Sequence, residues 1–138
     1  MRIRIATILN LHMALGVAVF VLLVILPVKY LTKRNRPTRL PEIKRYLNMR
    51  KRERNQPAYP SGDAAIAAYF FGLYYYVFAF PYFQYLILPL VCLGRVWMFC
   101  HWLGDTLTGA ILGLLMAMLW FSDPTFELIS GPLFNQFL

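Results

Sequence analysis

Long apolar stretches alternate with short polar segments along this chain, and the lengths of the stretches predict its helices. The first stretch covers about residues 5–28. A helix of that length rises about 36 Å, enough to cross a hydrocarbon core of about 30 Å. The stretch is too long for the core of a signal peptide, so we expect a retained spanning helix.

A second apolar stretch, over residues 64–93, is too long for one crossing. Pro81 and Gln84 near its middle indicate a turn between two helices. This pattern predicts one helix over about residues 64–80 and another over about residues 82–99.

The last apolar stretch predicts a helix over about residues 103–121, which the Asp-Pro pair at 123–124 ends. Gly109 and Gly113, about one helical turn apart, form a face of small residues that lets another helix approach closely. Together the stretches predict a single all-α domain over residues 1–138, a polytopic membrane bundle of about four transmembrane helices.

The composition favours a membrane protein over a soluble one. Of the 138 residues, 59% are hydrophobic and only 14% are charged, too few charges to cover the exterior of a water-soluble domain. The net charge of +8 is concentrated in a basic loop over residues 29–60, which is typical of a juxtamembrane segment attracted to anionic headgroups. Its part over residues 41–54 favours a short helix on the membrane surface. Nucleic acid is a poorer partner, because the aromatic residues lie in the apolar stretches and do not interleave with the charge.

Four spans would bring four helix ends to one side of the membrane. These are the end of the first helix, the start of the second, the end of the third and the start of the fourth. Asp63, Arg95 and Asp105, together with the first residues of the basic loop, lie at these ends. The topology therefore predicts one polar site built from all four helices.

Three short motifs lie at these helix ends. The first is Lys29 followed, after six residues, by Arg36 and a proline; the second is the sequence Pro-Ser-Gly-Asp at 60–63; the third joins Arg95, His101 and Asp105. In order and spacing they resemble the signature of the type 2 phosphatidic acid phosphatase superfamily, which also includes the vanadium haloperoxidases. That signature is Lys-x6-Arg-Pro, then Pro-Ser-Gly-His, then Ser-Arg-x5-His-x3-Asp.

The residue types suit a phosphate ester. Lys29, Arg36 and Arg95 supply positive charge, and the forks of the two guanidinium groups match phosphate oxygens. Ser61 and the Gly62 amide stand where a helix begins, with N–H groups that point outward and a helix dipole that favours an anion.

The histidine and the acid of the third motif are four residues apart. On a helix His101 and Asp105 would share a face, so the carboxylate could accept a hydrogen bond from one ring nitrogen and leave the other as a nucleophile. The resemblance implies that His101 attacks phosphorus to form a phosphohistidine and that Asp105 orients it. It also implies chemistry without a metal ion or a cofactor.

The chain departs from the family pattern at three points. Gly94 stands where the third motif has Ser, which removes one hydroxyl donor to phosphate. Asp63 stands where the second motif has His, the general acid of the family, so Asp63 would have to donate the proton. Cations nearby favour an ionised Asp63, which would pair with Arg36 or Arg95 and close the site. The third departure is size, since membrane members of the family usually have six spans and four are expected here.

Two functions stay open on this pattern. The first is a metal-independent lipid phosphate phosphatase, with His101, Asp105 and Asp63 as catalytic residues and a slow rate because the general-acid histidine is replaced. The second is a weak or inactive relative that binds lipid or serves as a structural subunit of a membrane complex. A transporter is disfavoured because the sequence shows no inverted repeat or broken helix pair.

The expected partners are membrane lipids, above all an anionic or phosphorylated lipid, with a homo-oligomer or a larger membrane complex as an alternative. We expect an integral membrane protein, and the endoplasmic reticulum, the mitochondrial inner membrane and the plasma membrane all stay open. The charge of the loop favours the cytosolic or matrix side for the polar end, whereas sites of the family commonly face the lumen or the outside.

Overall fold

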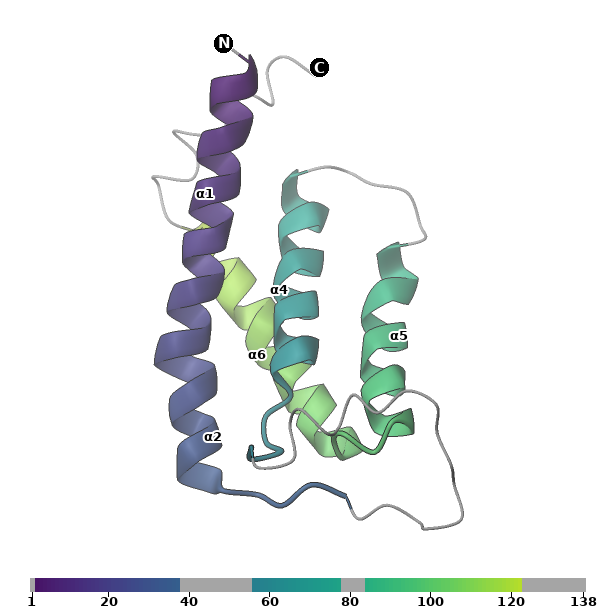
Figure 1. Ribbon diagram of the computed structural model, residues 1–138. Helices are drawn as coiled ribbons and strands as arrows, with labels where there is room; N and C mark the ends of the chain where they lie inside the picture. Colours follow the sequence, from purple (N-terminus) through teal and green to yellow (C-terminus); the bar gives the residue numbers. More distant parts are fainter. Residues whose placement is uncertain (1, 38–55, 78–83, 123–138) are drawn as a thin grey trace.

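The computed structural model describes residues 2–37, 56–77 and 84–122 (Figure 1). These ranges hold four helical rods and no strand, which confirms the all-α prediction. The surface helix expected within 41–54 and the turn expected at Pro81 lie outside the described residues.

The first rod is one continuous run of α1 (Arg2–Phe20), a π-helical turn η1 (Val21–Ile25) and α2 (Leu26–Thr32). Pro27 explains the π turn. A proline has no N–H to donate and its ring crowds the carbonyl four residues earlier, so the backbone widens there. The Leu26 N–H then reaches back five residues to the Val21 carbonyl. The helix passes Pro27 and extends beyond the predicted end at residue 28, so Lys29 lies in its last turn rather than after it.

The other three rods match the three predicted helices. They are α4 (Gly62–Val77), α5 (Gln84–Trp97) and α6 (Leu103–Phe121). The start of α4 and the end of α5 each lie two residues before the predicted position, within the usual uncertainty of a helix end, and α6 has the predicted bounds.

The end of α5 is set by a residue that is not glycine. Phe99 takes a left-handed conformation, with φ at 53°. Its N–H donates to the Val96 carbonyl, and the Cys100 N–H donates to the Arg95 carbonyl. These two bonds close a Schellman turn, which reverses the chain between Arg95 and the following segment.

The closest helix contact is between α4 and α6, where α6 crosses α4 diagonally (Figure 1). Gly109 and Gly113 make it close, since a Cβ at either position would run into the backbone carbonyl of Ser61 or Ala65. This confirms the predicted face of small residues. α1 packs beside them through Met13 and Phe20, against Tyr69 and Leu73 of α4 and Ala117 of α6, among others.

The four ends that carry the motifs gather at one end of the bundle, as the order of the helices predicts (Figure 1). Two described segments are long and apolar enough to cross a membrane, Leu11–Thr32 and Leu103–Trp120. The described parts of α4 and α5 are shorter apolar helices, so four crossings remain a prediction.

Candidate functional site

Backbone contacts tie the starts of α4 and α6 together under the site. Ser61 is fully buried, and its N–H donates to the Asp105 carbonyl at 2.9 Å. Its side-chain oxygen accepts a weak bond from the Ala64 N–H at 3.4 Å, as a residue at a helix start does. The amide of Ser61 is therefore engaged within the protein and does not point outward as the sequence predicts. The Gly62 amide stands in the first turn of α4, as expected.

His101 lies in the turn before α6 and not on the helix itself, because α6 begins at Leu103. The expectation that His101 and Asp105 share a helix face is therefore wrong. The imidazole is 2% exposed, and its Nδ1 is 2.7 Å from the Ala58 carbonyl oxygen. The distance from Nδ1 to the nearest Asp105 oxygen is 3.9 Å, too long for a hydrogen bond.

The contact with Ala58 fixes the tautomer of the imidazole. A carbonyl oxygen only accepts, so Nδ1 carries the proton and donates it to this oxygen. In the neutral ring, Nε2 then keeps its lone pair. Burial first, and then the positive charges of Arg36, Arg95 and Lys29, lower the pKa of His101 from 6.5 to about 4. His101 is therefore neutral at pH 7, in the form that a nucleophile needs.

Asp105 is engaged by partners other than the histidine. Its Oδ1 is 3.0 Å from Nη1 of Arg34, and its Oδ2 accepts the Trp102 N–H at 2.9 Å. The side chain of Asp105 is fully buried, whereas that of Arg34 is 48% exposed. Asp105 thus caps the start of α6 and neutralises an arginine that the three motifs do not contain.

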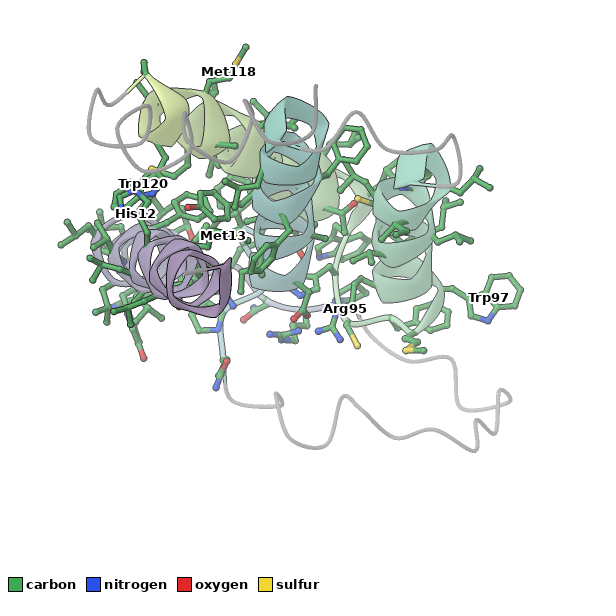
Figure 2. The ribbon with its side chains drawn as sticks, turned by 90° about the horizontal axis from the view of Figure 1, so that it is seen from above. His12, Met13, Arg95, Trp97, Met118 and Trp120 are labelled. Atoms are coloured by element: carbon green, nitrogen blue, oxygen red, sulfur yellow. The ribbon has the colours of Figure 1, made fainter. Side chains whose placement is uncertain are left out.

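Asp63 and Arg95 form the second ion pair of the site. The Asp63 Oδ2 is 2.9 Å from the Arg95 Nη2. Here the buried partner is the arginine, with 10% of its side chain exposed, while Asp63 is 53% exposed. Figure 2 shows Arg95 at the end of α5 next to α4, while Trp97 points away from the bundle. The expected pairing of Asp63 with an arginine of the site is present in this geometry.

Arg36 binds backbone carbonyls. Its Nη1 donates to the Cys100 carbonyl at 2.7 Å, and its Nε donates to the Gln56 carbonyl at 3.0 Å. Arg36 therefore joins the segment after α2 to the segment before α4 and to the turn that carries His101. Its charge stays close enough to His101 to lower the pKa of the imidazole.

Gly94 leaves room for the side chain that the family has at this position. A Cβ built there would meet no atom within 4 Å. The serine of the family motif would therefore fit without a shift of the backbone.

Two groups that take part in the site, Arg34 and the Ala58 carbonyl, are not part of the sequence motifs. Arg34 is one of many cations in the basic loop, and nothing in its spacing distinguishes it from Lys33 or Arg39. The Ala58 carbonyl is a backbone group, and only the folded chain shows that it is the acceptor for His101. Within the described ranges, no three His, Cys, Asp or Glu side chains lie close enough to hold a metal ion.

Comparison with known proteins identifies a family for this chain. The model of one family, described as the PAP2 superfamily, matches residues 6–127. The matched region includes all three motifs. No curated protein and no solved structure matches the chain.

Proposed function

This chain belongs to the PAP2 superfamily, and from that premise we propose that it is an integral-membrane lipid phosphate phosphatase that works through a phosphohistidine on His101. The observation that carries the proposal is the state of His101. The imidazole is buried and neutral, it donates Nδ1–H to Ala58, and it keeps an unprotonated Nε2 among cations.

A membrane location is supported by the distribution of apolar side chains. The helices expose many large apolar residues on their outer faces while polar groups of the site are buried, the reverse of a water-soluble protein. Examples along the first rod, α5 and α6 are Leu11, Leu23, Leu86, Leu90, Leu93 and Leu119. Lipid chains are the solvent that such a surface suits.

The proposed reaction has two steps. The Nε2 lone pair of His101 attacks phosphorus, an N–P bond forms, the P–O bond to the lipid breaks, and the leaving oxygen takes up a proton. Water then attacks the phosphohistidine, the N–P bond breaks and phosphate leaves. Lys29, Arg36 and Arg95 would neutralise the charge on the phosphoryl oxygens during both steps.

The ion pair of Asp63 with Arg95 is the obstacle to this reaction. A phosphate that binds Arg95 must first displace the carboxylate, and the family's proton donor is missing at the same position. General acid catalysis contributes about 10²–10⁴-fold, so we expect a slow enzyme.

The test is phosphate release from phosphatidate, a sphingoid-base phosphate and a prenyl phosphate in mixed micelles. Wild type is expected to exceed His101→Ala on at least one of them, with acid-labile phosphate trapped on the protein. Asp63→His is expected to raise the rate by about 10²-fold or more, since it restores the proton donor. Wild-type rates equal to those of His101→Ala on every substrate would refute the proposal.

The same ion pair favours a second candidate, an inactive relative that serves as a lipid-binding or structural subunit of a membrane complex. A subunit that does not hydrolyse phosphate would lose nothing if the carboxylate of Asp63 occupied the place of the phosphate on Arg95. This candidate predicts co-purification with partners in a fixed stoichiometry and no hydrolysis by Asp63→His. A homogeneous preparation of this chain alone that turns over substrate would exclude it.

A further inference from the structure

Arg34 contacts both residues that compete for the proton on His101. Its side chain holds Asp105, with 3.0 Å between Nη1 and Oδ1. Its backbone carbonyl accepts the Ala58 N–H at 2.8 Å, and the carbonyl of the same Ala58 is the acceptor for His101. Arg34 therefore fixes Asp105, to which His101 is not hydrogen-bonded, and also positions Ala58, whose carbonyl accepts the hydrogen bond from His101.

We propose that Arg34 is a positioning residue that holds the Asp105 carboxylate away from His101 and so leaves the imidazole bonded to the Ala58 carbonyl. The contacts stand independently of any activity. Their meaning for catalysis rests on the proposed function, in which the Nε2 of His101 is the nucleophile.

The distances show why the choice between the two acceptors depends on Arg34. Nδ1 is 2.7 Å from the Ala58 oxygen and 3.9 Å from the Asp105 Oδ2, a difference of 1.2 Å. A carboxylate normally attracts an imidazole N–H more strongly than a neutral carbonyl does. Asp105 stays away because Arg34 and the Trp102 N–H hold its two oxygens.

Trp102 keeps Arg34 in place. The guanidinium carbon of Arg34 lies 5.9 Å from the centre of the indole ring, within the range of a cation–π contact. The indole Nε1–H donates to the Asn35 carbonyl at 3.1 Å. The side chain of Trp102 thus anchors the segment after α2 to the start of α6, while its backbone N–H binds the capping Asp105.

Removal of the Arg34 side chain separates its two roles. In Arg34→Gln the backbone carbonyl still accepts from Ala58, but Asp105 loses its charged partner. The Trp102 N–H still holds Oδ2, but Oδ1 is left without its partner, and the Nδ1 of His101 lies only 3.9 Å from the carboxylate. An imidazole next to a carboxylate binds protons more tightly. Arg36, Arg95 and Lys29 still oppose protonation from their own sides. We therefore expect the pKa of His101 to rise by about one unit or more, since an opposite charge at this range shifts a pKa by about 1–3 units.

The chain offers a direct readout, because it contains only two histidines, His12 and His101. The full-length protein in detergent, labelled with ¹⁵N-histidine, is titrated between pH 3 and pH 8 and both imidazoles are followed by NMR. A His101→Asn sample serves only to assign the two sets of signals. Arg34→Gln is compared with Arg34→Lys, which keeps the charge, and with Lys33→Asn, which removes a neighbouring charge. Asn suits position 33 because Lys33 has φ at 45°.

The inference predicts that Arg34→Gln raises the pKa of His101 and moves its Nδ1–H resonance downfield. Arg34→Lys should restore most of the wild-type titration, and Lys33→Asn should leave it nearly unchanged. Equal titration of His101 in wild type and Arg34→Gln would overturn the inference, as would an equal shift in Lys33→Asn.

If Arg34→Gln does not fold, Arg34→Lys decides on its own: a longer, weaker contact predicts a small rise in the pKa of His101, and a fall in this pKa contradicts the inference. None of these outcomes depends on turnover, so a protein without phosphatase activity would refute the proposed function and leave this measurement valid.

Discussion

The ion pairs Arg34–Asp105 and Arg95–Asp63 lie at the same end of the bundle, 3.0 and 2.9 Å across, yet they bury opposite partners. In the first the carboxylate is fully buried and the arginine is half exposed. In the second the arginine is buried and the carboxylate is half exposed.

The difference predicts which pair an external anion can open. A phosphate competes with a carboxylate for an arginine, so it can replace Asp63, whose side chain can swing into solvent and be hydrated. It cannot replace Asp105, which has no path to water and also caps α6 through the Trp102 N–H. Under the proposed function, the first pair therefore belongs to the scaffold, and in the second Asp63 takes the place of the phosphate on Arg95.

The largest effect should come from loss of the buried carboxylate. Asp105→Ala removes two hydrogen-bonded contacts from a fully buried side chain, and we expect a loss of about 3 kcal/mol in the free energy of unfolding. Asp63→Ala makes the same chemical change at an exposed site and should cost about 1 kcal/mol. Thermal unfolding of both variants in the same detergent measures the contrast. Equal losses would show that the two carboxylates do not differ as their burial indicates.

A second effect comes from the imidazole between the two pairs. The pKa of His101 is lowered to about 4 in the folded protein, whereas an unfolded histidine titrates at about 6.5. As the pH falls, the unfolded chain takes up this proton first. The stability that the neutral imidazole provides is complete above about pH 6.5 and is lost between pH 6.5 and pH 4, by about 3 kcal/mol.

Unfolding curves at several pH values measure this loss, with His101→Asn as the control. In His101→Asn the loss between pH 6.5 and pH 4 should be reduced by about the same amount. For the same reason, turnover by wild type should persist well below pH 6.5. An acidic limb of activity centred near pH 6.5 would contradict the burial of His101.

The sequence pattern predicted the arrangement of the helices around this site better than the side-chain contacts within it. The lengths of the apolar stretches predicted four helices, and their order predicted that the motif-bearing ends meet. Gly109 and Gly113 predicted a close helix contact because small residues on one helix face let another helix approach closely. These are properties of whole segments, which composition and spacing report.

The side-chain contacts of the site depend on the backbone angles of single residues, and the residue types do not indicate these angles. Phe99 takes a left-handed conformation that glycine usually supplies, so the end of α5 and the turn that carries His101 had no sequence signal. Arg34 looks like any other cation of the basic loop. The family resemblance implied that Asp105 orients His101, and a spacing of four would place both on one helix face, but His101 is not on the helix.

Asp63→Asn should show that the exposed pair opens to anions. The amide keeps the shape of the side chain but cannot neutralise Arg95 as a carboxylate does. We expect vanadate, a phosphate analogue, to bind about tenfold more tightly, equivalent to about 1.4 kcal/mol. Calorimetric titration measures the affinity, and the double variant Asp63→Asn, Arg95→Gln should lose the gain. An unchanged vanadate affinity in Asp63→Asn would show that Asp63 does not compete for the anion site.

The smallest effect should come from the hydroxyl that the family motif has and this chain lacks. Gly94→Ser adds a donor next to Arg95 in the last turn of α5, at a position where a Cβ meets no atom within 4 Å. The backbone need not move, so we expect vanadate affinity to rise by about two- to fivefold, less than 1 kcal/mol, in line with a single neutral hydrogen bond. Gly104→Ser is the matched control, because it makes the same change at another position with room for a Cβ, on the exposed side of α6. A comparable gain in both variants would mean that serine acts through helix propensity, since it replaces glycine in a helix in each case. A gain in Gly94→Ser but not in Gly104→Ser, and additive with the gain in Asp63→Asn, would show that the side chain at position 94 faces the anion bound by Arg95.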